Sequence, residues 1–341
     1  MKPNANIFRR TKRTAALLLA AFFAASLCGC GAPKSLFEET PSPLPATAAP
    51  GENPFADPSG RPAGSEYPFE TGETATAEPG QSVRATLYYV TDEGYILPVS
   101  TVIPWETGIA KACLSRLIAT AGNSNELKKL GLNAPIPAGT VIQLSIEDGE
   151  ARVNLQNMPA LADYREEQNL FVSVINTLTQ FPSIDTVSVF INGSAARTAN
   201  GSELPCGAGA YALNVENGDV AVSGSAKAVT LYFPNSSGSQ FIPVTRYLSS
   251  DGLYRAISAL AEGTELPGLR GCFPENTLVL GAAIEGGVLT VNLSKDFEKI
   301  AETPGLYSLA MHTVLLTARP YGSIDEIRFT VNGVPYAPDD N

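Results

Sequence analysis

The residues that could carry out catalysis are few and lie far apart along the chain. The sequence contains one histidine, His312, so a Ser–His–Asp or Cys–His arrangement would have to use it. Apolar Met311 and Val314 surround His312 in a segment with helical spacing. We therefore expect His312 on a helix surface or half buried against it, and we assign no catalytic residue.

Carboxylates are numerous but do not cluster into a recognisable site. The adjacent pairs are Glu166-Glu167, whose side chains point apart on a helix, and Asp339-Asp340 in a polar tail. A metal site needs clustered His, Cys or carboxylate ligands, and a phosphate site needs a glycine-rich loop of defined spacing. Neither pattern is present, so we expect no metal and no cofactor.

The five cysteines form no CxxC pair. Cys28 and Cys30 lie near the N-terminus. Cys113 lies among apolar residues of an expected helix, which indicates a small buried side chain. Cys206 and Cys272 are far apart in sequence, so the sequence leaves open whether they form a disulfide.

The charge of the chain is strongly acidic, with a formal value of -11. Residues 1–29 hold five basic and no acidic residues, so their removal leaves 18 basic against 34 acidic residues, a net charge of -16. A body of this charge disfavours binding to nucleic acid or to anionic lipid. We therefore expect no nucleic-acid partner.

The N-terminal segment has the pattern of an export signal. A basic run precedes an apolar stretch at 15–27, which is too short to span a bilayer comfortably. The following Leu27-Cys28-Gly29-Cys30 resembles a bacterial lipobox, with Cys30 as the lipid-bearing residue after cleavage of residues 1–29. The alternatives are a plain secretory signal or an uncleaved anchor. Each puts the rest of the chain outside the cytoplasmic membrane, and the lipobox attaches it to the outer face.

Residues 30–82 are predicted to be a disordered, acidic tether. Residues 31–82 contain ten prolines and eight acidic against two basic residues. Such a composition cannot bury enough apolar surface to fold, and proline keeps it extended. Phe55, Tyr67 and Phe69 interrupt the pattern, as a short docking motif or simply as part of a spacer.

The remaining sequence is organised around a repeat. The stretch 176–193, NTLTQFPSIDTVSVFING, recurs at 316–333 as LTARPYGSIDEIRFTVNG, with six of 18 positions identical. Each copy reads as the end of an amphipathic helix, a turn and a strand with one buried face. Two copies of one unit indicate two copies of one domain. We place these domains at 83–193 and 228–336, with a linker at 194–227 and a tail at 337–341.

Each domain is predicted to have the order β-β-α-β-β-α-β. In the first domain, Pro98 favours an edge position for the second strand. A helix is expected from Pro104 to about Ala121, ended by Gly122-Asn123, and Asp148-Gly149 predicts a hairpin turn. Val153-Asn154-Leu155 recurs as Val291-Asn292-Leu293. In the linker, residues 210–215 and 219–222 are candidates for a small hairpin.

The repeated polar residues have both a structural and a ligand-binding interpretation. Asp185 and Asp325 are expected to cap the turn before the strand, since short polar side chains bond nearby backbone N–H groups. Asn192 and Asn332 precede glycine, and this pair tolerates positive φ at a strand end. Ligand contacts are the alternative. Trp105, the sole tryptophan, is either an interface anchor or a packing residue at a helix start.

These motifs together resemble the GerMN domain of sporulation and germination lipoproteins. The resemblance rests on the LYY and LYF strands, the VNL hairpins and FPSIDTVSVFING, and it covers roughly 220 residues. It implies an α+β fold in which two helices pack on a small sheet with an extra β-hairpin, similar to the ring-building motif of secretion-system rings. It also implies work in the space between mother cell and forespore, in support of an envelope-spanning assembly.

We therefore expect a non-enzymatic, lipid-anchored protein that binds envelope or transenvelope-complex proteins as an assembly or stability factor. The sequence leaves self-association open: ring-building motifs can associate head to tail, and two fused copies are either a ring fragment or units that have lost that ability. The alternatives are a peptidoglycan-active enzyme or accessory, and a sensor or solute-binding lipoprotein.

Overall fold

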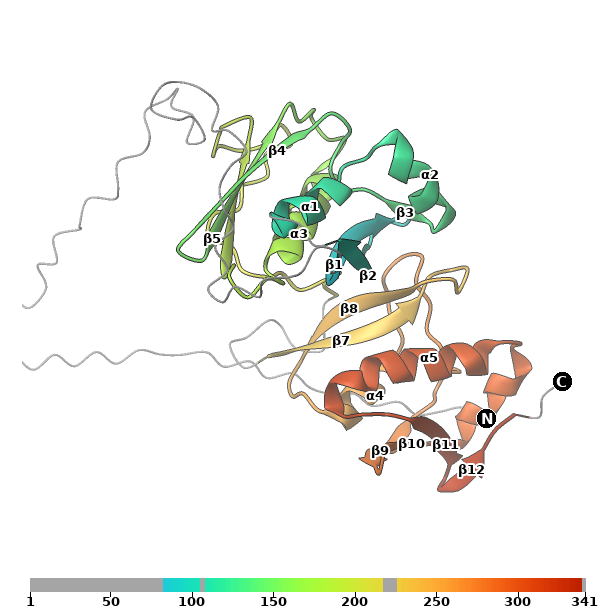
Figure 1. The fold of residues 1–341 in the computed structure, drawn as a ribbon. Coiled ribbons are helices and arrows are strands. Elements are labelled where there is room, and N and C mark those ends of the chain that lie inside the picture. The colour runs from blue at the N-terminus through green and yellow to red at the C-terminus, as the bar shows by residue number, and fades with distance from the viewer. Residues whose placement is uncertain (1–81, 105–107, 217–225, 339–341) are drawn as a thin grey trace, which may run out of the picture. The chain divides into compact units, whose positions relative to one another are not determined.

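The structure is a computed structural model, and it describes residues 82–104, 108–216 and 226–338. These ranges hold two copies of one α+β domain, each built from strands and helices in a similar order (Figure 1). The elements of the first copy are β1 (Ser82–Thr91), β2 (Ile96–Pro104), α1 (Ile109–Arg116), α2 (Ala121–Lys129), β3 (Leu132–Asn133), β4 (Val141–Glu147), β5 (Glu150–Gln156), α3 (Tyr164–Leu178) and β6 (Thr186–Ile191).

The second copy adds short 3-10 helices and a C-terminal strand. Its elements are β7 (Lys227–Pro234), β8 (Phe241–Leu248), α4 (Leu253–Ala261), β9 (Val279–Glu285), β10 (Val288–Leu293), η1 (Lys295–Glu302), α5 (Leu306–Ala318), η2 (Arg319–Tyr321), β11 (Glu326–Val331) and β12 (Val334–Tyr336). The predicted α+β class and the predicted element order are therefore confirmed, with extra short elements.

Each domain consists of helices packed between two small sheets. In the first, α1 and α3 contact β1 of the sheet β2-β1-β3 on one side, and β4 and β6 of the sheet β4-β5-β6 on the other. In the second, α4 and α5 contact β7 of the pair β7-β8, and α4 also contacts β9 of the sheet β12-β11-β10-β9. The extra hairpin expected from the sequence thus belongs to the second sheet, which packs on the other side of the helices.

The sheet β4-β5-β6 combines a hairpin with a parallel closing strand. Strand β4 pairs antiparallel with β5, and α3 then carries the chain back so that β6 lies parallel to β5, with Val153 opposite Val189. Strands β9, β10 and β11 repeat this arrangement, with Val291 opposite Phe329. A short turn suffices for the antiparallel pair, whereas the parallel pair needs the helical crossover.

The core of each domain follows the apolar spacing of its helices and strands. On α3 the apolar stripe Leu170, Val174 and Leu178 is fully buried. Val187 and Val189 of β6 are buried as predicted. Ser188 was expected on a solvent-facing side of this strand, yet it is 2% exposed. A later segment of the chain, described below, covers it.

The helix predicted from Pro104 to about Ala121 is wrong in extent. Helix α1 ends at Arg116, and a separate helix, α2, begins after Thr120. Thr120 is extended, with φ of -132°, and its hydroxyl accepts from the Asn123 N–H while the Asn123 side chain accepts from the Thr120 N–H. This capping box starts a new helix where Gly122-Asn123 was expected to end one.

Other local predictions agree with the structure. Asp148 and Gly149 have φ of 49° and 80° and close the β4-β5 hairpin. Strand β2 lies at the end of its sheet, as Pro98 indicated. Within the described residues, no helix is long and apolar enough to cross a bilayer.

Candidate functional site

The two residues singled out from the sequence for function lie outside the described residues. These are Cys30, the expected lipid attachment point, and Trp105, the candidate interface anchor. Both therefore stay predictions. The candidate site is built below from the repeated polar residues and from the segment that follows the first domain.

The repeated aspartate joins the closing strand to the hairpin turn. The Asp185 backbone N–H donates to the Gly149 carbonyl at 2.8 Å, and the Asp325 N–H donates to the Gly287 carbonyl at the same distance. A Cβ built on Gly149 would meet the Asp185 carboxylate at 2.7 Å. The backbone bonds, rather than the expected side-chain cap, thus fix the turn, and the carboxylate lies over the glycine.

The repeated Asn-Gly is held by the asparagine of the VNL motif. Asn192 and Asn332 have φ of 52° and 49°, which confirms the predicted positive φ. The Gly193 N–H donates to Asn154 Oδ1 at 2.9 Å, and the Gly333 N–H donates to Asn292 Oδ1 at 2.8 Å. The sequence showed both motifs but not the bond between them. The one sequence feature that could have indicated this bond is that the VNL motif and the Asn-Gly pair recur together in both domains.

The single histidine takes part in surface packing. His312 is exposed on α5, its Nδ1 lies 2.7 Å from the Ser308 carbonyl, and its ring stacks on Phe241 with centroids 5.6 Å apart. The helix-surface expectation is confirmed. Cys206 and Cys272 are not joined in a disulfide, and Cys113 is buried.

Residues 194–216, expected to be part of a linker, form a segment that we call the strap. The strap runs along the outer edge of β6: Val187 and Ala208 exchange both backbone hydrogen bonds at 2.9 Å, and the Val189 N–H donates to the Pro205 carbonyl at 2.8 Å. Residues 210–215 form no strand, and residues 219–222 lie outside the described residues. The strap thus covers β6 without adding a full strand.

A buried carboxylate on α3 holds the first half of the strap. Glu167 is 2% exposed and accepts hydrogen bonds from the Thr198 and Ser202 hydroxyls and from the Asn200 N–H. Burial alone would raise the pKa of Glu167, but these hydrogen bonds to the charged form outweigh burial and lower it. Glu167 therefore remains charged at neutral pH.

Two asparagines hold the middle of the strap through backbone groups. Asn176 of α3 donates from Nδ2 to the Tyr211 carbonyl at 2.9 Å and accepts the Tyr211 N–H at 2.8 Å. Asn214 of the strap accepts the Ile96 N–H and donates to the Ile96 and Pro243 carbonyls. Each side chain substitutes for a peptide group, so the strap needs little regular structure of its own.

The end of the strap carries a buried ion pair. Glu216, 8% exposed, accepts from Arg246 of β8 through Nε at 3.1 Å and through a terminal nitrogen at 2.5 Å. Its other oxygen accepts from the Thr264 hydroxyl and the Glu265 N–H. Burial works against the charged form, yet the hydrogen bonds from Thr264 and Arg246 lower the pKa of Glu216.

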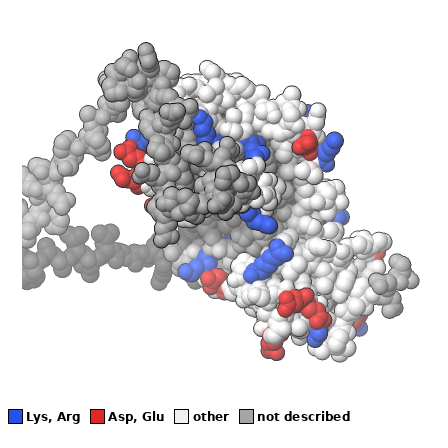
Figure 2. All heavy atoms as spheres, viewed as in Figure 1, with Lys and Arg blue, Asp and Glu red and all other residues white. Residues whose placement is uncertain are grey.

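The described residues contain no group of three or more His, Cys, Asp or Glu side chains arranged to hold a metal. On the one face that Figure 2 displays, basic and acidic side chains are scattered among uncharged residues. The polar side chains described above bond to one another and to the backbone. The arrangement can therefore fasten one segment of the chain to another.

Comparison with known proteins gives the family. The model of a family named Germane and described as "Sporulation and spore germination" matches residues 86–197 and 230–337, which together exceed half of the chain. The chain belongs to the Germane (GerMN) family. The match to two regions also accounts for the internal repeat.

Two relatives support this assignment. The Germane chain is 28% identical over 283 residues to the "Spore germination protein GerM" of Bacillus subtilis (strain 168), covering 77% of this chain and 76% of the relative. It also resembles the solved "Tandem GerMN domains of the sporulation protein GerM" from the same organism, with a TM-score of 0.53 and 23% identity, over 76% of this chain and 97% of that one. The predicted family and the tandem fold are confirmed, and a role in sporulation or germination follows at this level of detail.

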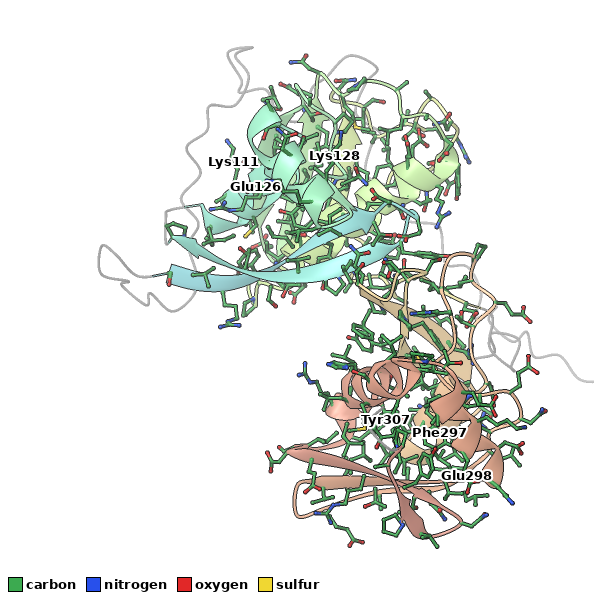
Figure 3. All side chains as sticks on the ribbon, turned by 90° about the vertical axis from the view of Figure 1, so that its right-hand side faces the viewer. Lys111, Glu126, Lys128, Phe297, Glu298 and Tyr307 are labelled. Atoms are coloured by element: carbon green, nitrogen blue, oxygen red, sulfur yellow. The ribbon has the colours of Figure 1, made fainter. Side chains whose placement is uncertain are left out.

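The two Germane domains differ at one aligned position that bears on the strap. Glu167 of α3 aligns with Tyr307 of α5, 140 residues later. Tyr307 packs edge-on against Phe329 at 5.6 Å, and Phe329 packs against Phe297 at 5.0 Å. Figure 3 labels Tyr307 and Phe297 of this cluster. The second domain thus has an aromatic cluster where the first has a charged anchor, and β12 rather than a strap borders its closing strand.

Proposed function

We propose that this Germane protein is a lipid-anchored, extracytoplasmic, non-enzymatic factor that binds protein partners. It assists the assembly or stability of an envelope complex during sporulation or germination. The observation that carries the proposal is the tandem pair of Germane domains behind a lipobox-like N-terminus. The polar residues common to both domains serve internal hydrogen bonds, which leaves binding through surfaces as the function that best fits.

The anchor is tested by substituting Cys30 with serine. We expect wild-type protein to remain with the membrane fraction and to incorporate a labelled fatty acid, and Cys30→Ser to do neither. Cys28→Ser is the matched control, because Leu27 before it is too bulky for the residue preceding a cleavage site. Incorporation of label into Cys30→Ser would contradict the anchor.

The protein partner is tested with a photocrosslinking residue at Trp105 in sporulating cells. We expect a defined adduct with an envelope or transenvelope-complex protein. Val102 is the control position, because it is 58% exposed on the neighbouring strand β2. Equal adducts from both positions would argue against Trp105 as an anchor. An adduct with a second copy of this chain would indicate self-association instead.

The non-enzymatic part of the proposal has its own test. Purified protein incubated with peptidoglycan should yield no new muropeptide by liquid chromatography. A new product that disappears when one acidic residue is substituted would show that the protein is a cell-wall enzyme.

A further inference from the structure

The strap and strand β12 serve the same purpose by different means. Strand β12 follows β11 after the two-residue turn Asn332-Gly333 and pairs with it at three successive positions. The strap borders β6 through three backbone bonds at Val187 and Val189 and through two more where the strap begins, between Ile191 and Ser194. Because the backbone pairing is short, the side-chain anchors must supply much of what keeps the strap on this edge.

The charged anchors are two buried carboxylates, one near each end, and the uncharged ones are Asn176, Asn214 and the Gly207 N–H bond to Ser188 Oγ. Glu167 holds the loop 198–202, and Glu216 is bound by Arg246, Thr264 and the Glu265 N–H. Both fit their sites as anions, because every group that bonds them is a donor and the ionised form offers acceptors on both oxygens with no proton to place. Protonation would remove the charge that these donors stabilise and would leave the Arg246 guanidinium without its buried counter-ion.

We propose that the strap is an acid-released latch: protonation of Glu167 and Glu216 frees residues 198–216 and uncovers the outer edge of β6, while the sheet and helices of the first domain stay folded. The free edge would then expose the N–H and carbonyl of Val187 and the N–H of Val189. An extended peptide can add to such an edge by main-chain hydrogen bonds. This inference goes beyond the proposed function and does not depend on it.

The groups around each carboxylate determine whether its ionised or its protonated form is favoured. The groups that bond Glu167 are uncharged, namely Thr198, Asn200 and Ser202.

Around Glu216 lie Arg246, which also reaches Glu262 at 3.5 Å, and Tyr95, whose phenol interacts with the Glu216 charge. Arg246 favours the ionised form of Glu216. Glu262 shares Arg246 from a solvent-exposed position, with 59% of its side chain accessible.

The sign of the pH dependence follows from the lowered pKa values of both glutamates in the folded protein. Their contribution is complete above the ordinary glutamate pKa, 4.5, and is lost as the pH falls through the lower folded values. The latch therefore holds at neutral pH and opens only in distinctly acidic solution.

Hydrogen exchange of the full chain, followed by mass spectrometry, tests the latch. Rates are corrected for intrinsic exchange between pH 7 and about pH 3. We expect the amides of Val187, Val189 and Ala208, which bond between β6 and the strap, to lose about tenfold or more of their protection in acid. Amides of β5 should keep theirs. Glu167→Gln, which mimics the protonated side chain, should show the same local opening at pH 7.

Matched controls exist for each carboxylate. Glu203→Gln lies on the strap, but its side chain is 77% exposed in a surface ion pair with Arg197, so it should leave protection at pH 7 unchanged. Glu262→Gln is the matched control for Glu216→Gln, because Glu262 contacts the same arginine from a solvent-exposed position. The wild-type titration needs no substitution, so it stands even if a variant fails to fold.

Two results would overturn the proposal. One is unchanged protection of the Val187, Val189 and Ala208 amides across the pH range. The other is loss of protection in β5 and α3 at the same pH as in the strap, which would show global unfolding rather than release of a latch.

Discussion

Asn154 shows how one buried side chain can join two distant motifs. It is fully buried on β5, accepts the Gly193 N–H, and donates to Gln143 of β4 at 2.8 Å. It thereby connects the hairpin of the sheet to the turn that ends the closing strand. Asn292 does the same for Gly333 in the second domain, and it also accepts from the Thr330 hydroxyl.

Replacing Asn154 with alanine should destabilise the first domain by about 1–3 kcal/mol, because the Gly193 N–H loses its partner and a buried site empties. Chemical unfolding of the full chain would measure the loss. Gln143→Ala is the control, since it removes only the amide contact and should cost less. An equal or smaller loss for Asn154→Ala would show that the turn does not depend on this bond.

The cysteines differ sharply in expected reactivity. Cys206 is exposed, whereas Cys113 and Cys272 are buried, and burial raises the pKa of Cys272 to about 11. Thiolate is the reactive form, so a maleimide should modify Cys206 in the native protein and leave the other two unmodified. Peptide mapping after brief labelling would test this. Recovery of a peptide linking Cys206 to Cys272 would contradict the structure.

At the scale of elements, the hairpin turns accept only glycine at their second position. Gly149 has φ of 80°, and a Cβ there would press on the Asp185 carboxylate. Gly287 repeats both features against Asp325. The pairing of a hairpin glycine with the aspartate before the parallel strand therefore fixes where β6 and β11 begin.

Gly149→Ala should cost about 1–2 kcal/mol for the positive φ and about 1–3 kcal/mol more for the contact with Asp185. Gly139→Ala separates the two effects, because Gly139 has φ of 84° and open space around its Cβ position. Thermal unfolding of both variants would show the difference. If both variants lose the same stability, the aspartate moves aside without cost.

Elements with strong periodicity were predictable from the sequence, and those set by side-chain anchoring were not. The apolar stripe of α3 and the alternation of β6 identified both elements because their burial follows local spacing. The break between α1 and α2 was missed because Thr120 and Asn123 form a capping box within an apparently continuous helix. Capping competes with helix continuation and leaves only a weak trace in composition.

The strap was the larger feature that the sequence did not predict. Its Gly, Ser and Asn content is typical of a linker, and its order comes from Glu167, Asn176 and Arg246, which lie far from it in sequence. From the sequence, Glu167 was one of an adjacent pair whose side chains point apart on a helix. Only the fold shows that Glu167 points inward, while exposed Glu166 accepts the Ala162 N–H just before α3. Long-range polar partners of this kind cannot be read from spacing.

At the scale of the whole molecule, the buried pair of Arg246 and Glu216 should dominate the acid sensitivity of the second half. Arg246→Met leaves Glu216 buried without its counter-ion and should destabilise the protein by about 3–5 kcal/mol at pH 7. Because the pKa of Glu216 is lowered in the folded state, this difference from wild type should shrink as the pH falls below about 4.5.

Urea unfolding at several pH values would measure both effects. Glu262→Gln should cost under about 1 kcal/mol, since Glu262 is a solvent-exposed partner of the same arginine. A difference between wild type and Arg246→Met that stays constant into acid would show that Glu216 titrates no differently in the folded and unfolded states.

The bond from Asn154 to Gly193, and its copy from Asn292 to Gly333, also bears on how the protein ages. At an Asn-Gly pair, the glycine nitrogen can attack the preceding side-chain carbonyl and expel ammonia, and water then opens the resulting succinimide to aspartate or isoaspartate. In both turns that nitrogen already gives its hydrogen to a fixed acceptor. Asn192 and Asn332, although both are exposed, should therefore deamidate slowly.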